Sequence, residues 1–174
     1  NGIVFCFDEF GFKRHISKSL ILWMNYISIL FTAFLFGGML LFSVGFGTLA
    51  FKFLETPIAR HFIRKTFPFF YFYVFSISAV ASAILYFHNF DAFVLMLIIA
   101  ITTIPNAFIL MPAINFSADN KFKRRFIVLH GLSVCITLTH IILAASVLYY
   151  LSWLSKLVIN ESFNTIAVIR LFNC

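Results

Sequence analysis

Histidine is the first residue type in this chain whose chemistry could hold a cofactor. Two of the five histidines, His130 and His140, lie in the last long apolar segment. Imidazole binds haem iron and copper, but two haem ligands must lie at similar depth on facing helices. These two are separated by about 15 Å along one helix. We therefore predict no cofactor, with haem or copper at His130 or His140 as the alternative. We expect His140 to hydrogen-bond a neighbouring helix, through the Thr137–Thr139 region.

A second polar feature lies in the middle of the third apolar segment. Thr102, Thr103 and Asn106 surround Pro105 there. Proline has no N–H, so it frees the backbone carbonyl of Ile101 four residues earlier. An asparagine within hydrocarbon must find a hydrogen-bond partner. The patch is thus predicted to be a kink satisfied inside a helix bundle, or alternatively a polar lining for a small substrate.

Catalytic and metal-binding motifs are not found in the sequence. The three cysteines, Cys6, Cys135 and Cys174, have neither CxxC nor paired spacing, so zinc and disulfides are not indicated. No serine or cysteine lies in a recognisable nucleophile motif. No Asp, Glu, Lys or Arg falls deep in an apolar segment, which argues against a carboxylate-relay carrier. We predict no enzyme activity and no metal site.

Composition places these residues in a membrane. Of 174 residues, 62% are hydrophobic and 11% charged, and the mean hydropathy is +1.01. Soluble domains average about 45–50% apolar and 25% charged residues. A soluble enzyme, a disordered tail and a secreted disulfide scaffold are excluded. The net charge of +7 could suggest nucleic acid, but the cations cluster in two short loops, so we predict no nucleic-acid partner.

Four apolar runs are long enough to cross a bilayer. They cover about residues 20–53, 67–87, 92–114 and 126–154. The predicted fold is an all-α integral membrane protein, a four-transmembrane-helix bundle. Thr56 and Pro57 resemble a helix start, and residues 57–65 are predicted to form a short interfacial helix between helices one and two. The predicted divisions are an N-terminal interfacial segment (1–19), the transmembrane domain (20–155) and a C-terminal tail (156–174).

The loops predict orientation. Basic residues concentrate between runs one and two and between runs three and four, whereas the loop between runs two and three has no Lys or Arg. The positive-inside rule puts both basic loops in the cytoplasm and both termini on the other side. The membrane is predicted to be a bacterial inner membrane or an organellar one. The residues expected to face lipid headgroups are Arg60, His61, Arg64, Lys65, Lys121, Lys123, Arg124 and Arg125.

Several motifs resemble a known family. Thr66-Phe67-Pro68-Phe69-Phe70-Tyr71-Phe72 opens the second run, and Phe126-Ile127-Val128-Leu129-His130-Gly131-Leu132-Ser133 opens the fourth. Gly37-Gly38 lies in the first run, and Asn106, Pro112 and Asn115 precede the second basic loop. Over about residues 25–152 the chain resembles the four-helix family typified by eukaryotic transmembrane protein 205 and its bacterial domain-of-unknown-function relatives.

The resemblance implies a four-helix membrane bundle without a defined activity. The layout is also similar to copper-resistance D membrane proteins and to haem-dependent protoporphyrinogen oxidases. Those relatives place a histidine in helix one, where residues 20–53 of this chain have none.

Three functional hypotheses follow. The first is a non-catalytic accessory or structural subunit of a larger membrane complex, such as an energy-transducing assembly. Its partners would be other integral membrane subunits and lipids, and it could form a homo-oligomer. The second is an independent small transporter or metal-handling protein that uses Thr103, Asn106, His130 and His140. The third is a haem-bound membrane oxidoreductase.

Overall fold

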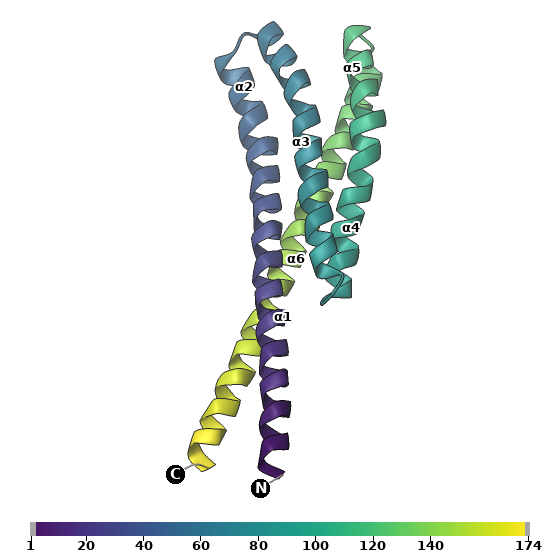
Figure 1. The fold of residues 1–174 in the computed structure, drawn as a ribbon. Coiled ribbons are helices and arrows are strands. Elements are labelled where there is room, and N and C mark those ends of the chain that lie inside the picture. The colour runs from purple at the N-terminus through teal and green to yellow at the C-terminus, as the bar shows by residue number, and fades with distance from the viewer. Residues whose placement is uncertain (1–2, 173–174) are drawn as a thin grey trace.

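The computed structural model describes the backbone of residues 3–172 and the side chains of residues 20–157 and 160. Every described element is a helix (Figure 1). In chain order these are α1 (Ile3–Leu40), π-helix η1 (Leu41–Phe46), α2 (Gly47–Phe53), α3 (Thr56–Leu85), α4 (Phe90–Pro105), π-helix η2 (Asn106–Leu110), α5 (Met111–Asp119) and α6 (Lys123–Phe172).

The predicted four-helix membrane fold is confirmed. Four helical stretches have the length and hydropathy of membrane spans: Leu20–Phe53, Thr56–Leu85, Phe90–Asp119 and Lys123–Leu157. An α-helix satisfies its own backbone hydrogen bonds, which is the condition for crossing hydrocarbon. The predicted segment 1–19 and most of the predicted tail 156–174 lie outside the residues whose side chains are described.

The predicted separate interfacial helix is wrong. Residues 57–65 are helical, but they form the first turns of α3, which continues past Pro68 to Leu85. Glu55 is the residue before this helix, and no side chain caps it. Proline suits the first turn of a helix, as Pro57 does here, and α3 also accommodates Pro68 in its interior without ending.

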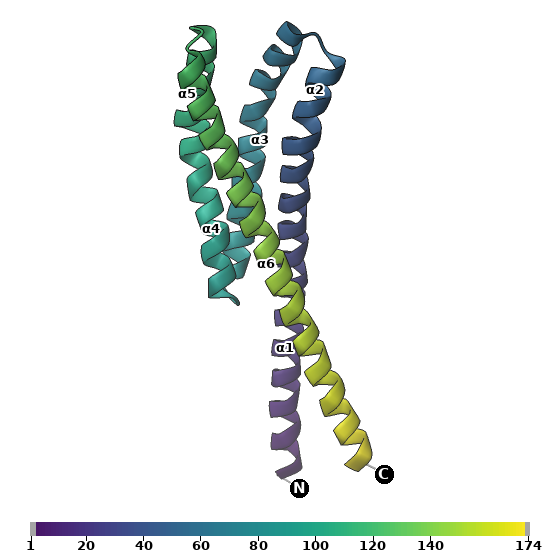
Figure 2. The same ribbon diagram turned by 180° about the vertical axis from the view of Figure 1, so that it is seen from behind.

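Both chain termini lie at one end of the molecule, and the α2–α3 and α5–α6 connections lie at the other (Figure 1). α3 packs along α4 and α1, while α6 packs against α1, α4 and α5. Figure 2 shows α6 crossing α1 obliquely, and both helices continue past the α3–α4 turn. At that turn Asn89 Oδ1 accepts a hydrogen bond from the Ala92 N–H at 3.1 Å and so caps α4.

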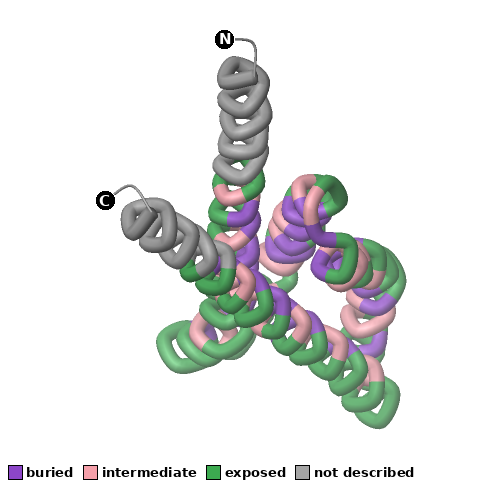
Figure 3. The backbone as a smooth tube through the Cα atoms, turned by 90° about the horizontal axis from the view of Figure 1, so that it is seen from below, coloured by how far each residue is buried: buried purple, intermediate pink, exposed green. Residues whose placement is uncertain are grey.

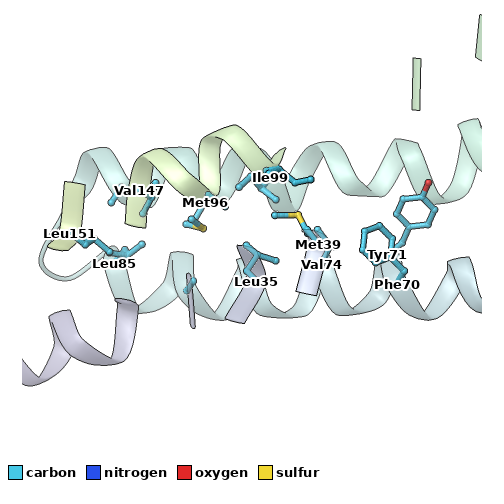
Figure 4. Close-up of a cluster of buried hydrophobic side chains, with 14 residues drawn as sticks. Leu35, Met39, Phe70, Tyr71, Val74, Leu85, Met96, Ile99, Val147 and Leu151 are labelled. Carbon is cyan, nitrogen blue, oxygen red and sulfur yellow. The ribbon is translucent and has the colours of Figure 1, made fainter. Parts of the chain in front are cut away.

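The core is a line of apolar side chains contributed by all four spans (Figure 4). Leu35 and Met39 of α1, Leu85 of α3, Met96 of α4 and Leu151 of α6 are completely shielded. Viewed along the bundle, the buried residues face inward and the outer sides of the helices are exposed (Figure 3). The exposed sides are apolar, as expected for helices that face lipid or other membrane helices.

One glycine sets how closely α1 and α3 approach. Tyr73 of α3 lies against Gly38 of α1, and its hydroxyl donates a hydrogen bond to the Phe34 carbonyl. A Cβ at position 38 would lie 2.6 Å from Tyr73 Cζ. The neighbouring Gly37 has nothing within 4 Å of such a Cβ. Only one of the two adjacent glycines is therefore needed for this contact.

Candidate functional site

The polar patch of the third span lies at a change of helix type. α4 ends at Pro105, and the next five residues form η2. Thr102 Oγ1 and Thr103 Oγ1 donate to the carbonyls of Ile98 and Ile99 at 2.6 and 2.7 Å, respectively. Asn106 opens η2 and is only 2% exposed. Short π-helical segments occur often at functional sites, which makes this segment the first place to look.

Asn106 is held by a hydrogen-bond chain that crosses three spans. Ser133 Oγ of α6 donates to Asn106 Oδ1 at 3.0 Å, and Tyr71 Oη of α3 lies 3.2 Å from Ser133 Oγ. A serine hydroxyl has one proton. Since that proton goes to Asn106, the tyrosine must donate to the serine. We call this set Tyr71, Ser133 and Asn106 the polar chain.

A separate hydrogen-bonded pair, of which His140 is buried and Thr102 half-buried, lies one turn of α4 away. Thr102 Oγ1 and His140 Nε2 are 2.7 Å apart, and His140 is 5% exposed. The prediction that His140 bonds a neighbouring helix is therefore confirmed, but the predicted Thr137–Thr139 region is not its partner. Those two threonines donate to carbonyls of their own helix instead. Of the predicted patch, Thr102 thus belongs to this pair and Asn106 to the polar chain, whereas Thr103 bonds only its own helix.

Aromatic rings enclose the polar chain on the α1 side. Phe42 of η1 stacks on Phe70 of α3, with ring centroids 4.2 Å apart and an interplanar angle of 11°. Phe70 neighbours Tyr71, and both are nearly completely buried. η1 thus packs behind the tyrosine whose hydroxyl leads to Asn106 in η2. Tyr71, Ser133 and Asn106 are all buried, and hydrogen bonds between buried groups are stronger than those in water.

The two histidines proposed as cofactor ligands are not brought together. His130 is exposed, and its ring stacks on Phe126 at 5.5 Å. His140 is buried against Thr102, as described above. Among the residues whose side chains are described, no group of three His, Cys, Asp or Glu side chains could hold a metal ion.

The residues predicted to face headgroups meet at the end of the bundle opposite the termini. Arg64 on α3 makes a bidentate ion pair with Asp119 on α5, with N–O distances of 2.8 and 3.1 Å. This pair links the two basic loops directly. All eight residues are exposed: Arg60, His61, Arg64, Lys65, Lys121, Lys123, Arg124 and Arg125.

A family model matches the part of the chain that holds the first three spans. The model of a family described as Domain of unknown function (DUF4149) matches residues 30–123, more than half of the chain. The chain belongs to the DUF4149 family. No curated protein and no solved structure matches it. The match includes Tyr71, Thr102 and Asn106 but stops where α6 begins, so the partners of these residues on α6 lie beyond the DUF4149 region.

The sequence did not identify two members of the polar chain, Tyr71 and Ser133, as functional candidates. Tyr71 lies in a run of aromatic residues, where its hydroxyl is hard to distinguish from an ordinary lipid-facing ring. Ser133 stood out only as the last residue of a motif. The sequence signal that could have identified them is that both are polar residues inside membrane spans, where a hydroxyl needs a hydrogen-bond partner. In the folded chain, Ser133 bonds the asparagine that the sequence did single out, and Tyr71 bonds Ser133.

Proposed function

We propose that this DUF4149 chain is a non-catalytic subunit of a larger assembly of integral membrane proteins. The observation that carries the proposal is the contrast between its interior and its outer faces. Inside, the polar side chains are partnered within the bundle: Tyr71, Ser133 and Asn106 bond in a chain, and Thr102 bonds His140. Outside, α6 exposes mostly apolar and aromatic side chains, among them Leu138, Ile142, Tyr149 and Trp153. This arrangement suits a bundle that packs against partners more than one that processes a substrate.

The outer face of α6 is the proposed contact surface. In the most apolar 18-residue stretch of Lys123–Leu157, 17% of the residues are buried, compared with 39% in that of Thr56–Leu85. Cys135, Ile142, Tyr149 and Trp153 recur at helical spacing on the side opposite the core, and all four are exposed. A small residue such as Cys135 lets another helix approach, and the aromatic rings add contact area.

The proposal extends to location and relatives. Since the basic loops share one end, we place that end in the cytoplasm or its equivalent and both termini on the opposite side. The membrane would be a bacterial inner membrane or an organellar one. We also propose kinship with the transmembrane protein 205 family and, more distantly, with copper-resistance D proteins. Support for this kinship comes from the sequence motifs at residues 66–72 and 126–133.

Native electrophoresis of mildly solubilised source membranes, followed by mass spectrometry, tests the proposal. We expect the chain to migrate in a band well above the mass of a dimer, with the same companion membrane proteins in every preparation. Migration at monomer mass would contradict the proposal. Migration as a pure multimer of this chain would replace the mixed assembly with a homo-oligomer.

The native thiol of Cys135 tests the proposed surface itself. With Cys6 and Cys174 changed to serine, Cys135 is the remaining thiol for a membrane-permeant maleimide. We expect slow labelling in the intact assembly and fast labelling after dissociation by a harsh detergent. Val80→Cys, combined with Cys135→Ser, places a matched exposed thiol on α3. Equal rates for both thiols in the intact assembly would exclude the α6 face as the contact surface.

The polar chain supports a second candidate, a small transporter. Asn106 is set by a π-helix and joined to two other spans, which could form the wall of a path for a small polar substrate. Asn106→Leu would then abolish uptake or resistance without unfolding the protein. Thr139→Leu, on the exposed side of α6, is the control. Unchanged uptake in the Asn106 variant would rule out this candidate.

A further inference from the structure

A basic pocket with an apolar wall lies at the end of the bundle opposite the termini. It is a shallow, open depression where the α5–α6 turn meets the first turns of α6, with a volume of about 600 Å³. Its lining residues are Phe122, Lys123, Arg124, Arg125, Val128 and Leu129. Three consecutive cations thus stand beside three apolar side chains, a combination that matches an amphipathic anion.

The positive charge of this pocket is not balanced locally. Asp119 is the only acidic residue between positions 111 and 130. Its carboxylate is already engaged by Arg64 through two charge-assisted hydrogen bonds. The cations of the pocket therefore remain available to an external anion, and the start of α6 adds the positive end of a helix dipole.

One of the three cations is held in place. The Arg125 guanidinium lies over the Phe116 ring of α5, 5.9 Å from its centroid. A cation–π contact of this kind restricts the side chain without using its hydrogen-bond donors. Arg125 is thus oriented while its donors stay free for a phosphate, which guanidinium groups bind through two parallel hydrogen bonds.

The apolar wall continues into the membrane span. Val128 and Leu132 are one helical turn apart on α6, and they are 63% and 51% exposed. They form a track from the pocket toward the hydrocarbon region. A free phosphate would make no contact with these apolar side chains, whereas the acyl chain of a lipid would pack along them.

We infer that this pocket binds the headgroup of an anionic phospholipid from the leaflet at the basic-loop end. The headgroup phosphate pairs with Lys123, Arg124 and Arg125, and an acyl chain lies along Val128 and Leu132. Because the spans and this pocket belong to the single chain, the inference does not depend on the subunit proposed above. In this inference Arg64 does not bind the lipid but neutralises Asp119 beside the pocket.

Native mass spectrometry of the full chain in a neutral detergent tests the inference. Phosphatidylglycerol and phosphatidylcholine with identical acyl chains are titrated, and lipid-bound protein is counted. Lys123→Gln/Arg124→Gln/Arg125→Gln should weaken phosphatidylglycerol binding about tenfold or more. The matched control Lys52→Gln/Arg60→Gln/Lys65→Gln removes three exposed cations from the other basic loop and should change binding by less than about twofold.

Three results would overturn the inference. Equal binding of phosphatidylcholine would mean that charge does not select the lipid. An equal loss in the control variant would mean that only the total charge of this end counts. If inorganic phosphate displaces phosphatidylglycerol at stoichiometric levels, the ligand is the free anion. Should the triple variant not fold, Val128→Trp places a bulky ring on the wall of the pocket at an exposed site, and unchanged phosphatidylglycerol binding there would equally refute the site.

Discussion

Replacing Gly38 with alanine is expected to push α1 and α3 apart. The new Cβ would lie 2.6 and 2.7 Å from Tyr73 Cζ and Cε1, where carbon atoms normally keep about 3.5–4.0 Å. An aromatic ring cannot bend away, so the whole Tyr73 side chain or the helix must move. Either movement also disrupts the hydrogen bond from the Tyr73 hydroxyl to the Phe34 carbonyl.

The size of the effect follows from three contributions. Overpacking costs about 1–3 kcal/mol, and the lost hydrogen bond costs about 1 kcal/mol. Alanine returns up to about 1 kcal/mol because it favours the helix more than glycine does. Gly37→Ala receives only this last contribution, since nothing lies within 4 Å of its Cβ. The two alanine variants should therefore differ in unfolding free energy by about 2–4 kcal/mol.

Unfolding in mixed detergent micelles, followed by far-ultraviolet circular dichroism, measures this difference. Tyr73→Phe alone should cost about 1 kcal/mol, because it removes only the hydroxyl. In a Tyr73→Ala background, the Gly38 substitution should lose its penalty. Equal stability of the two glycine variants in the native background would refute the close contact between α1 and α3, and so would a penalty that persists without the tyrosine ring.

The remaining predictions concern polar groups at three depths. Ser133→Ala should cost about 1–3 kcal/mol because it leaves two buried polar atoms without their partner, whereas Ser146→Ala, at an exposed site, should cost less than about 0.5 kcal/mol in the same unfolding assay. Burial lowers the pKa of His88 from its ordinary value of 6.5. The unfolded chain therefore takes up this proton first, so stability should fall as the pH drops below about 6.5, and His88→Asn should flatten that part of a pH titration. Arg64→Gln should cost less than about 1 kcal/mol at low salt, since the ion pair with Asp119 is exposed, and a cost that persists in 1 M salt would contradict a screened ion pair.

The sequence predicts the spans and the polar patch well for a simple reason. A run of apolar residues without charge has few alternatives to a membrane helix, and an asparagine beside a proline within such a run needs a partner. The burial of Asn106 follows from this. A role of Asn106 in transport stays a prediction.

The partners of that asparagine could not be predicted. Each helix face can be read from one sequence, but the rotation and crossing of the helices decide which faces meet. Tyr71 and Ser133 are 62 residues apart in the sequence. Ser133 reaches both Tyr71 and Asn106 because α6 crosses the other helices obliquely. The continuity of α3 was missed for a related reason. Charged residues at 60, 64 and 65 change the composition of the helix without breaking its backbone.

The π-helix η1 has a consequence for changes in chain length. A π turn holds one more residue than an α turn, so it acts as a single-residue insertion that the helix absorbs locally. Deleting one residue elsewhere in the first span would rotate everything beyond it by about 100° and turn packed faces toward lipid. A deletion between Leu41 and Phe46 instead restores a regular helix while both flanks keep their faces. In relatives whose first span is one residue shorter, we therefore expect the missing residue to fall within the segment that matches Leu41–Phe46.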